Sequence, residues 1–121
     1  MLDRTTIHLL ALSATVAVEM GGMGLWAWLA SMPLLRAITS ACLVNLLVHT
    51  LFWYAQPLFA GELLGIEWPF GLYLAELLVV VGEGALYRRL LTLHSYTPWL
   101  LSLLLNAASF MAGLWLWQAI A

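Results

Sequence analysis

Four long apolar runs, separated by short polar or proline-containing segments, make up most of the chain. Each run has about the 20 residues that an α-helix needs to cross the hydrocarbon core of a bilayer. Thr5 and Thr6 are candidate N-caps for the first run, and prolines 33, 57 and 69 mark the breaks between runs, because proline removes a helical hydrogen bond. The pattern predicts an all-α fold. We expect a polytopic integral membrane protein whose single domain, residues 1–121, is a four-transmembrane-helix bundle with short loops, its helices at about 7–30, 34–55, 70–91 and 96–118.

The composition agrees with a lipid environment. Hydrophobic residues make up 64% of the chain and charged residues only 8%, against about 25% charged in soluble domains. The formal net charge is −2, and the four basic residues are all arginines. Such a chain has no basic patch for a phosphate backbone, so nucleic acid is not an expected partner. The single cysteine, Cys42, lies in an apolar run, where we expect it to contribute to packing.

The positions of the arginines predict the orientation in the membrane, because cytoplasmic loops carry the excess of Lys and Arg. Arg36, Arg88 and Arg89 lie beside the two short turns. Arg4 lies on the other side, together with the acidic segment 60–69. We therefore expect both termini and that segment to face outward, and we expect the membrane to be a bacterial inner membrane.

Polar and ionisable residues interrupt the apolar runs at matching depths, if residues are counted inward from the expected helix ends at about 1.5 Å each. His49 lies eight residues before Pro57 and Glu76 lies seven after Pro69, so we expect these two side chains to pair in the outer half of the membrane. A second polar layer, near the middle of the membrane, is expected to contain Glu19, Asn45, Glu83, Asn106 and Ser109.

Within each helix, the polar residues share one face because they are three, four or seven positions apart: Asn45 with His49, Glu76 with Glu83, and Asn106 with Ser109. A carboxylate that faces lipid is the costliest arrangement, so these faces should turn inward and give the bundle a polar interior. Small residues should let the helices approach closely, in particular Gly21, Gly22, Gly24, Gly82, Gly84 and Gly113.

These residues suggest a chemistry as well as a packing role. Burial in a medium of low dielectric favours the protonated form of a carboxyl, which is the property that a proton carrier uses. Carboxyls grouped with an imidazole are also ligands for a divalent cation, and the pair expected to bind one is Glu76 with His49. The alternative is a structural role, in which the carboxyls are hydrogen-bonded groups that only fix helix packing. The sequence contains no P-loop, H-E-x-x-H, C-x-x-C or nucleophile-elbow motif, so we assign no catalytic residue.

The length and the number of expected spans are similar to those of the small multidrug-resistance transporters, which are four-helix proteins that work as dimers. Glu19, in the middle of the first expected helix, resembles the essential carboxylate of that family. Glu76 and Glu83, in the third, depart from the family's pattern. The resemblance is therefore limited to architecture, and we assign no family from it.

The leading hypothesis from the sequence is a small membrane transport protein, working as an oligomer, that binds a cation or carries protons. Its candidate binding residues are Glu19, Glu76, Glu83, His49, Asn45, Asn106 and Ser109. One alternative is an accessory or assembly subunit of a larger membrane complex, in which His49 is an axial ligand of a haem or a chlorophyll-type metal. Another is a membrane enzyme that acts on a lipid.

Overall fold

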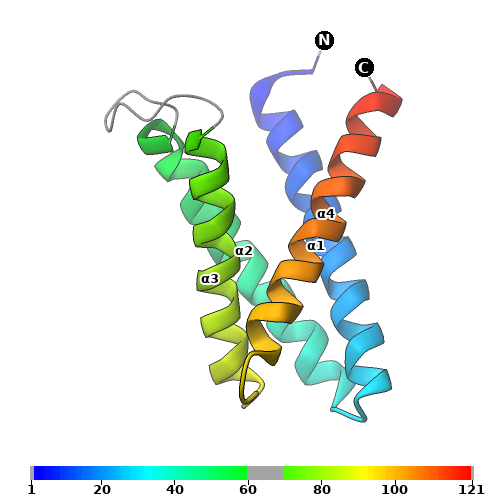
Figure 1. Cartoon of the computed structure of the whole chain (residues 1–121). Coiled ribbons are helices and arrows are strands. Elements are labelled where there is room, and N and C mark those ends of the chain that lie inside the picture. Colours follow the sequence, from blue (N-terminus) through cyan, green and yellow to red (C-terminus); the bar gives the residue numbers. More distant parts are fainter. Residues whose placement is uncertain (1, 60–69, 121) are drawn as a thin grey trace.

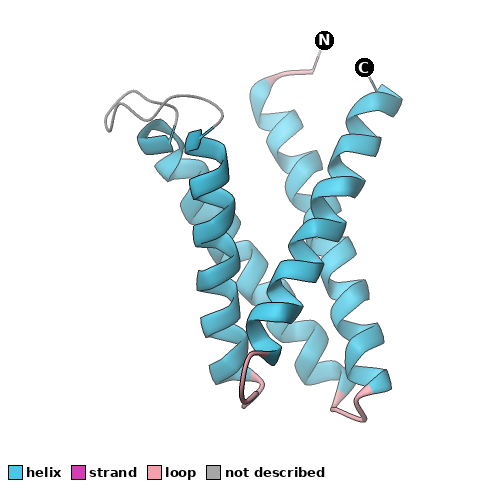
Figure 2. Cartoon of the chain, viewed as in Figure 1, coloured by secondary structure: helices cyan, strands magenta, loops and turns pink. Residues whose placement is uncertain are grey.

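The structure is a computed structural model and describes residues 2–59 and 70–120. This part of the chain is all-helical, as predicted, with α1 (Arg4–Leu29), α2 (Leu34–Phe59), α3 (Phe70–Leu90) and α4 (Thr97–Ile120). Figure 2 shows the four helices and the short turns that join α1 to α2 and α3 to α4. The acidic segment 60–69, expected to be an outward-facing loop, lies outside the described residues.

Each helix packs against its neighbours in sequence, and α1 also packs against α4, so the four helices form a closed ring. Both termini lie at one end of the bundle, and the α1–α2 and α3–α4 turns lie at the other (Figure 1). In this view the pair α2 and α3 diverges from the pair α1 and α4 toward the end that carries the termini. We call the two ends of the bundle the terminal end and the turn end.

Within the described residues, three helical segments are long and apolar enough to cross a membrane: Thr5–Leu29, Leu34–Ala55 and Thr97–Ala119. Their large hydrophobic side chains face outward, for example Leu35, which is 80% exposed, and Trp115, which is 71% exposed. This supports the predicted integration in a membrane. Helix α3 is not one of the three; it has 21 residues and includes Glu76 and Glu83 as well as two arginines in its last turn.

The helix ends have identifiable causes. Helix α1 begins earlier than expected because Asp3, rather than Thr5 or Thr6, is its N-cap. The Asp3 carboxylate accepts a hydrogen bond from the Thr6 backbone N–H at 2.6 Å, and this bond holds the pKa of Asp3 below its ordinary value. Helix α2 extends to Phe59, four residues beyond its expected end at 55.

Helices α1 and α3 end in the same way, with a residue in the left-handed conformation. After α1, Ser31 has φ 55° and the Met32 N–H donates to the Ala27 carbonyl at 2.8 Å. After α3, Thr92 has φ 52° and the Leu93 N–H donates to a carbonyl one turn back at 3.1 Å. Both are Schellman motifs, in which the left-handed position usually contains glycine.

Close helix contacts hold the bundle together near the turn end. A Cβ added at Gly22 would lie 2.5 Å from the Leu105 side chain, whereas one added at Gly21 would meet nothing within 4 Å. The Arg36 guanidinium, at the start of α2, donates to the Leu90 carbonyl at the end of α3 at 2.6 and 3.0 Å. It thereby satisfies one of the carbonyls that a helix end leaves without a partner.

Candidate functional site

A polar cluster occupies the centre of the bundle, and every helix contributes to it. Glu19 on α1, Asn45 on α2 and Glu83 on α3 have exposed fractions of 0%. Asn106 and Ser109 on α4 are buried, at 5% and 6%. The structure thus brings together the five residues that depth counting assigned to one layer.

Hydrogen bonds to both carboxylate oxygens fix Glu19. The Asn45 amide donates to Glu19 Oε2 at 2.6 Å, and the Ser109 hydroxyl donates to Glu19 Oε1 at 3.2 Å. The same Asn45 amide nitrogen lies 2.8 Å from the Ala41 carbonyl and 3.3 Å from the Tyr87 hydroxyl. Glu19 therefore links α1 to α2 directly and to α4 through Ser109, with Tyr87 of α3 at the edge of the network.

Only one carboxylate oxygen of Glu83 accepts a hydrogen bond from the described residues. The Asn106 amide donates to Glu83 Oε2 at 2.7 Å and is itself positioned by the Ser102 carbonyl, one turn earlier on α4, at 2.8 Å. The other oxygen, Oε1, lies 3.5 Å from Nε2 of His49. This distance is longer than that of a good charge-assisted hydrogen bond, which is about 2.7–2.9 Å.

Three buried polar atoms of this cluster have no hydrogen-bond partner among the described residues: Asn45 Oδ1, His49 Nε2 and Glu83 Oε1. Each can act as a ligand for a cation, and the imidazole nitrogen and the carboxylate oxygen are also of the kind that can accept a proton. In addition, one ligand atom from each of Glu19, His49 and Glu83 lies within 4.8 Å of the other two. Buried polar atoms are nearly always paired in proteins, so this group has the chemistry of a site for a cation or a proton.

The structure does not pair His49 with Glu76, as the sequence led us to expect, but places it against Glu83. The expected depth of His49 was counted from Pro57 as the end of the helix, whereas α2 continues to Phe59. The two added residues place His49 about 3 Å deeper, at about 1.5 Å per residue, which covers only part of the roughly 10 Å between Glu76 and Glu83 along α3. Glu76 is half-buried and lines a pocket between α3 and α4 that Asn106 also lines. The candidate ligand atoms that lie close together in the described residues come from Glu19, His49 and Glu83.

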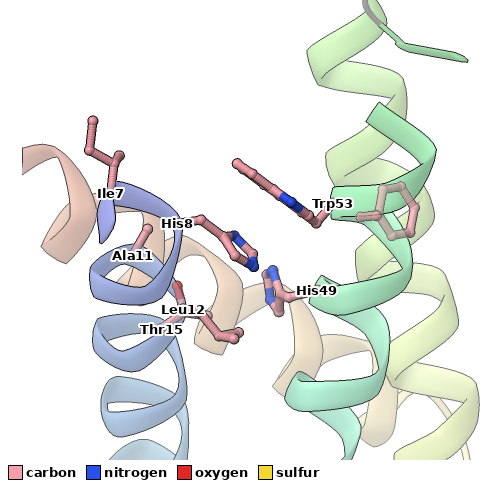
Figure 3. Close-up of a pocket in the computed structure, with 8 residues that line it drawn as sticks. Ile7, His8, Ala11, Leu12, Thr15, His49 and Trp53 are labelled. Carbon is pink, nitrogen blue, oxygen red and sulfur yellow. The ribbon is translucent and has the colours of Figure 1, made fainter. Parts of the chain in front are cut away.

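A pocket of about 280 Å³ between α1 and α2 leads from the terminal end toward the cluster. His8, Thr15, His49 and Trp53 are among its lining residues, and Figure 3 shows the His8 and His49 rings facing one another beside Trp53. The His8 and Trp53 rings stack, with centroids 3.8 Å apart. The His49 side chain is 26% exposed and that of Glu83 is 0% exposed, so His49 is the member of the cluster that can be reached from the pocket.

Three further residues of the site were not singled out from the sequence. They are Tyr87, whose hydroxyl lies beside the Asn45 amide, Ser102, whose carbonyl positions Asn106, and His8, which lines the pocket. A regular spacing could have identified the first two, because Tyr87 lies four residues after Glu83 and Ser102 lies four before Asn106. For His8, the signal was its position near one helix end, at a depth similar to that of Trp53.

No protein-family model matches this chain, and no curated protein or solved structure is significantly similar to it.

Proposed function

We propose that this chain is a small membrane transport protein in which Glu19, His49 and Glu83 bind a cation or carry protons. One observation carries the proposal. Two fully buried carboxyls and an imidazole converge to within 4.8 Å, and the facing atoms of His49 and Glu83 have no hydrogen-bond partner among the described residues. These two atoms face each other at 3.5 Å without a hydrogen bond, and a buried polar group without one costs about 1–3 kcal/mol, so a proton or a cation held between them would be favoured.

The charges of the two carboxyls make protons and cations alternative occupants of the site. Two ionised carboxylates cannot remain close together in a low dielectric without a counter-charge. Either a proton or a bound cation can neutralise them, and the two compete for the same oxygens. A site of this kind can exchange one for the other, which is the elementary step of proton-coupled transport.

The separation of the ligand atoms is compatible with a divalent metal. Carboxylate oxygen and imidazole nitrogen bind such ions at about 2.0–2.2 Å, so two tetrahedral ligands lie about 3.4 Å apart. The His49 Nε2 and Glu83 Oε1 atoms are 3.5 Å apart. The amide oxygen of Asn45, which also has no partner among residues 2–59 and 70–120, is a further oxygen ligand on the same network.

The pocket between α1 and α2 supplies the route to the site. A proton or cation from the terminal end would meet His8 and then His49 before the buried carboxyls. An imidazole can accept a proton on one nitrogen and release one from the other, so His49 is suited to relay a proton from the pocket to Glu83.

The membrane arrangement that we propose includes α3 as a fourth span, because it packs antiparallel between α2 and α4 and follows their course (Figure 1). In this arrangement the turn end, with Arg36, Arg88 and Arg89, faces the cytoplasm of a bacterial cell and both termini face outward. We further propose a homo-oligomer. Gly82 on α3 and Gly113 on α4 meet no atoms within 4 Å of an added Cβ, so these small residues are available for packing between protomers.

Flux measurements in proteoliposomes test the transport proposal. Liposomes that enclose a pH-sensitive dye would be given a proton gradient, with Na⁺, Mg²⁺, Mn²⁺ or Zn²⁺ outside. We expect the wild-type protein to dissipate the gradient, and we expect Glu83→Gln and Glu19→Gln to abolish that flux because each removes an ionisable group of the cluster. Glu76→Gln is the matched control, since it removes a carboxyl from the same helix outside the cluster.

Two results would contradict the proposal. One is a wild-type protein that shows no flux with any of these ions, and the other is an unchanged flux in both cluster variants. Native purification gives an independent check. A large partner protein at fixed stoichiometry, or a visible chromophore, would instead favour an accessory subunit.

A further inference from the structure

A second pocket, of about 580 Å³, lies at the turn end between the last turn of α3, the α3–α4 turn and the start of α4. It does not overlap the polar cluster or the pocket that leads to it. Its polar lining residues are Arg88, Arg89, Thr92, His94 and Trp99. The remaining lining is apolar, so a strongly basic wall meets a hydrophobic one.

The arginines of this pocket have no acidic partner. Within the described residues neither Arg88 nor Arg89 makes an ion pair, since the single pair in that part of the chain joins His49 and Glu83. The sequence explains why, because no Asp or Glu side chain occurs in residues 20–61 or 84–121, which include both turns. The positive charge at this end therefore remains available to an external anion.

The pocket is held in shape by its neighbours. The Arg88 guanidinium lies over the Trp99 ring, 5.6 Å from its centroid, in a cation–π contact. Trp99 in turn packs directly on Gly84, where an added Cβ would lie 2.4 Å from the indole. The left-handed conformations of Thr92 and Ser95, at φ 52° and 58°, give the turn its tight course. A shaped basic site loses less conformational freedom on binding than isolated surface arginines would.

The depth of the pocket in the membrane identifies its ligand. The apolar span Thr97–Ala119 starts immediately after the α3–α4 turn, so the pocket lies at the level of the lipid headgroups. A guanidinium offers paired donors that match a phosphate, and Trp99 is an aromatic residue of the kind found at this boundary. The apolar wall is suited to the glycerol and the first part of an acyl chain.

We infer that the Arg88 and Arg89 pocket binds the phosphate headgroup of an anionic phospholipid. A zwitterionic lipid carries a cationic ammonium group that the arginines would repel, whereas an anionic lipid such as phosphatidylglycerol brings a net negative charge. This inference does not depend on transport, because it concerns a different site, at the turn end of the bundle.

Native mass spectrometry of the purified full-length protein tests the inference. The protein would be titrated with phosphatidylglycerol and with phosphatidylcholine of the same acyl chains. We expect the wild type to retain phosphatidylglycerol preferentially, and we expect this preference to fall about fivefold for each arginine replaced by glutamine at positions 88 and 89. Arg4→Gln is the matched control, because it removes the same charge near the other end and should leave the preference unchanged.

A lysine variant and a competition with inorganic phosphate separate lipid binding from misfolding and from binding of free phosphate. Arg88→Lys with Arg89→Lys preserves the charge and loses only the paired donors, so it should retain part of the preference even if the glutamine variant does not fold. Inorganic phosphate at equal concentration should not displace the lipid, and displacement would identify free phosphate as the ligand and overturn the lipid assignment. Equal retention of both lipids by the wild type, or an unchanged preference in the glutamine and lysine variants, would also overturn it.

Discussion

Glu19 and Glu83 are equally buried but are not equivalent. Both oxygens of Glu19 accept hydrogen bonds, from Asn45 and Ser109, whereas Glu83 accepts one from Asn106 and turns its second oxygen toward His49. Glu19 is therefore the more rigid group, and Oε1 of Glu83 is the carboxylate oxygen that can bind a cation with the least rearrangement. In a transport cycle, Glu83 and His49 would exchange the ion while Glu19 sets the charge of the site.

The hydrogen bond from Asn106 to Glu83 can be tested by its contribution to stability. Asn106→Leu leaves Glu83 Oε2 buried without its donor, so we expect the free energy of unfolding to fall by about 1–3 kcal/mol. Adding Glu83→Met removes the acceptor that has lost its donor. The double variant should therefore recover most of the lost free energy of unfolding. Steric trapping of the unfolded protein in bicelles would give the free energies. Additive losses in the double variant would show that the two residues are not coupled.

The depth of a residue in the bundle, counted from the expected helix ends, is predicted correctly near the middle of the helices and wrongly for His49. Errors at helix ends have little effect on the middle of the membrane, so Glu19, Asn45 and Asn106 could be assigned to one level from the sequence alone. The position of His49 depended on where α2 ends, and Pro57 does not stop that helix. Hydrogen-bond partners such as Tyr87 depend on the rotation of each helix, which spacing within one helix does not determine.

At the scale of the elements, small residues decide where helices can touch. The sequence identified the glycines but could not tell which of them face a neighbour. In the structure, an added Cβ would meet Trp99 at Gly84 and nothing within 4 Å at Gly82, although the two glycines flank the same glutamate. The contact is made by the rigid indole ring, which cannot move aside as the end of a flexible side chain can.

Gly84→Ala should therefore destabilise the packing of α3 against α4. Overpacking of this kind costs about 1–3 kcal/mol, and the matched variant Gly82→Ala should have no effect or stabilise slightly, because alanine is the better helix former. Thermal unfolding followed by tryptophan fluorescence would compare the two. Equal stabilities would contradict the close approach of Trp99 to Gly84.

A substitution in the turn after α1 is predicted to stabilise the protein. Ser31 adopts φ 55° at the end of a Schellman motif, a conformation that is unfavourable for L-residues by roughly 1–2 kcal/mol and has no such penalty for glycine. Ser31→Gly should raise the free energy of unfolding by about 1 kcal/mol. Ser31→Ala is the control, since it removes the hydroxyl and retains the strained Cβ. A stabilisation by alanine as large as that by glycine would assign the effect to the hydroxyl instead.

At the scale of the whole molecule, the cluster is open toward one end of the bundle. The pocket beside His49 faces the terminal end, whereas the buried Tyr87 lies one turn after Glu83 on α3, toward the turn end. Transport would require a second conformation in which the helices separate at the turn end, in place of a continuous pore.

The competition between protons and a cation predicts how binding depends on pH. Carboxylates and imidazole must lose protons before they coordinate a metal, so the dissociation constant for a divalent cation should fall as the pH rises. Each binding event should also release protons. Titration calorimetry in two buffers of different ionisation enthalpy measures both effects, and binding that is independent of pH would contradict a shared site.

Much of the architecture could be predicted from hydropathy. Four apolar runs of suitable length gave four helices, and their order along the chain places both termini at one end (Figure 1). Within the part of the chain that the structure describes, α1, α2 and α4 contain segments long and apolar enough to cross a membrane, and α3, which includes four charged residues, is not among them. The pocket beside His49 could not be foreseen, because it depends on how far the helix pairs diverge.

Infrared difference spectroscopy tests the central claim most directly, because it detects a protonated carboxyl in an apolar site by its C=O stretch. The purified protein in lipid would be taken from low to high pH, and then exposed to divalent cations at constant pH. We predict that the wild type loses a protonated-carboxyl band on both treatments, that the double variant Glu19→Gln with Glu83→Gln lacks this band, and that Glu76→Gln retains it. A wild-type spectrum in which no carboxyl band responds to pH or to any cation would show that the cluster only holds the helices together.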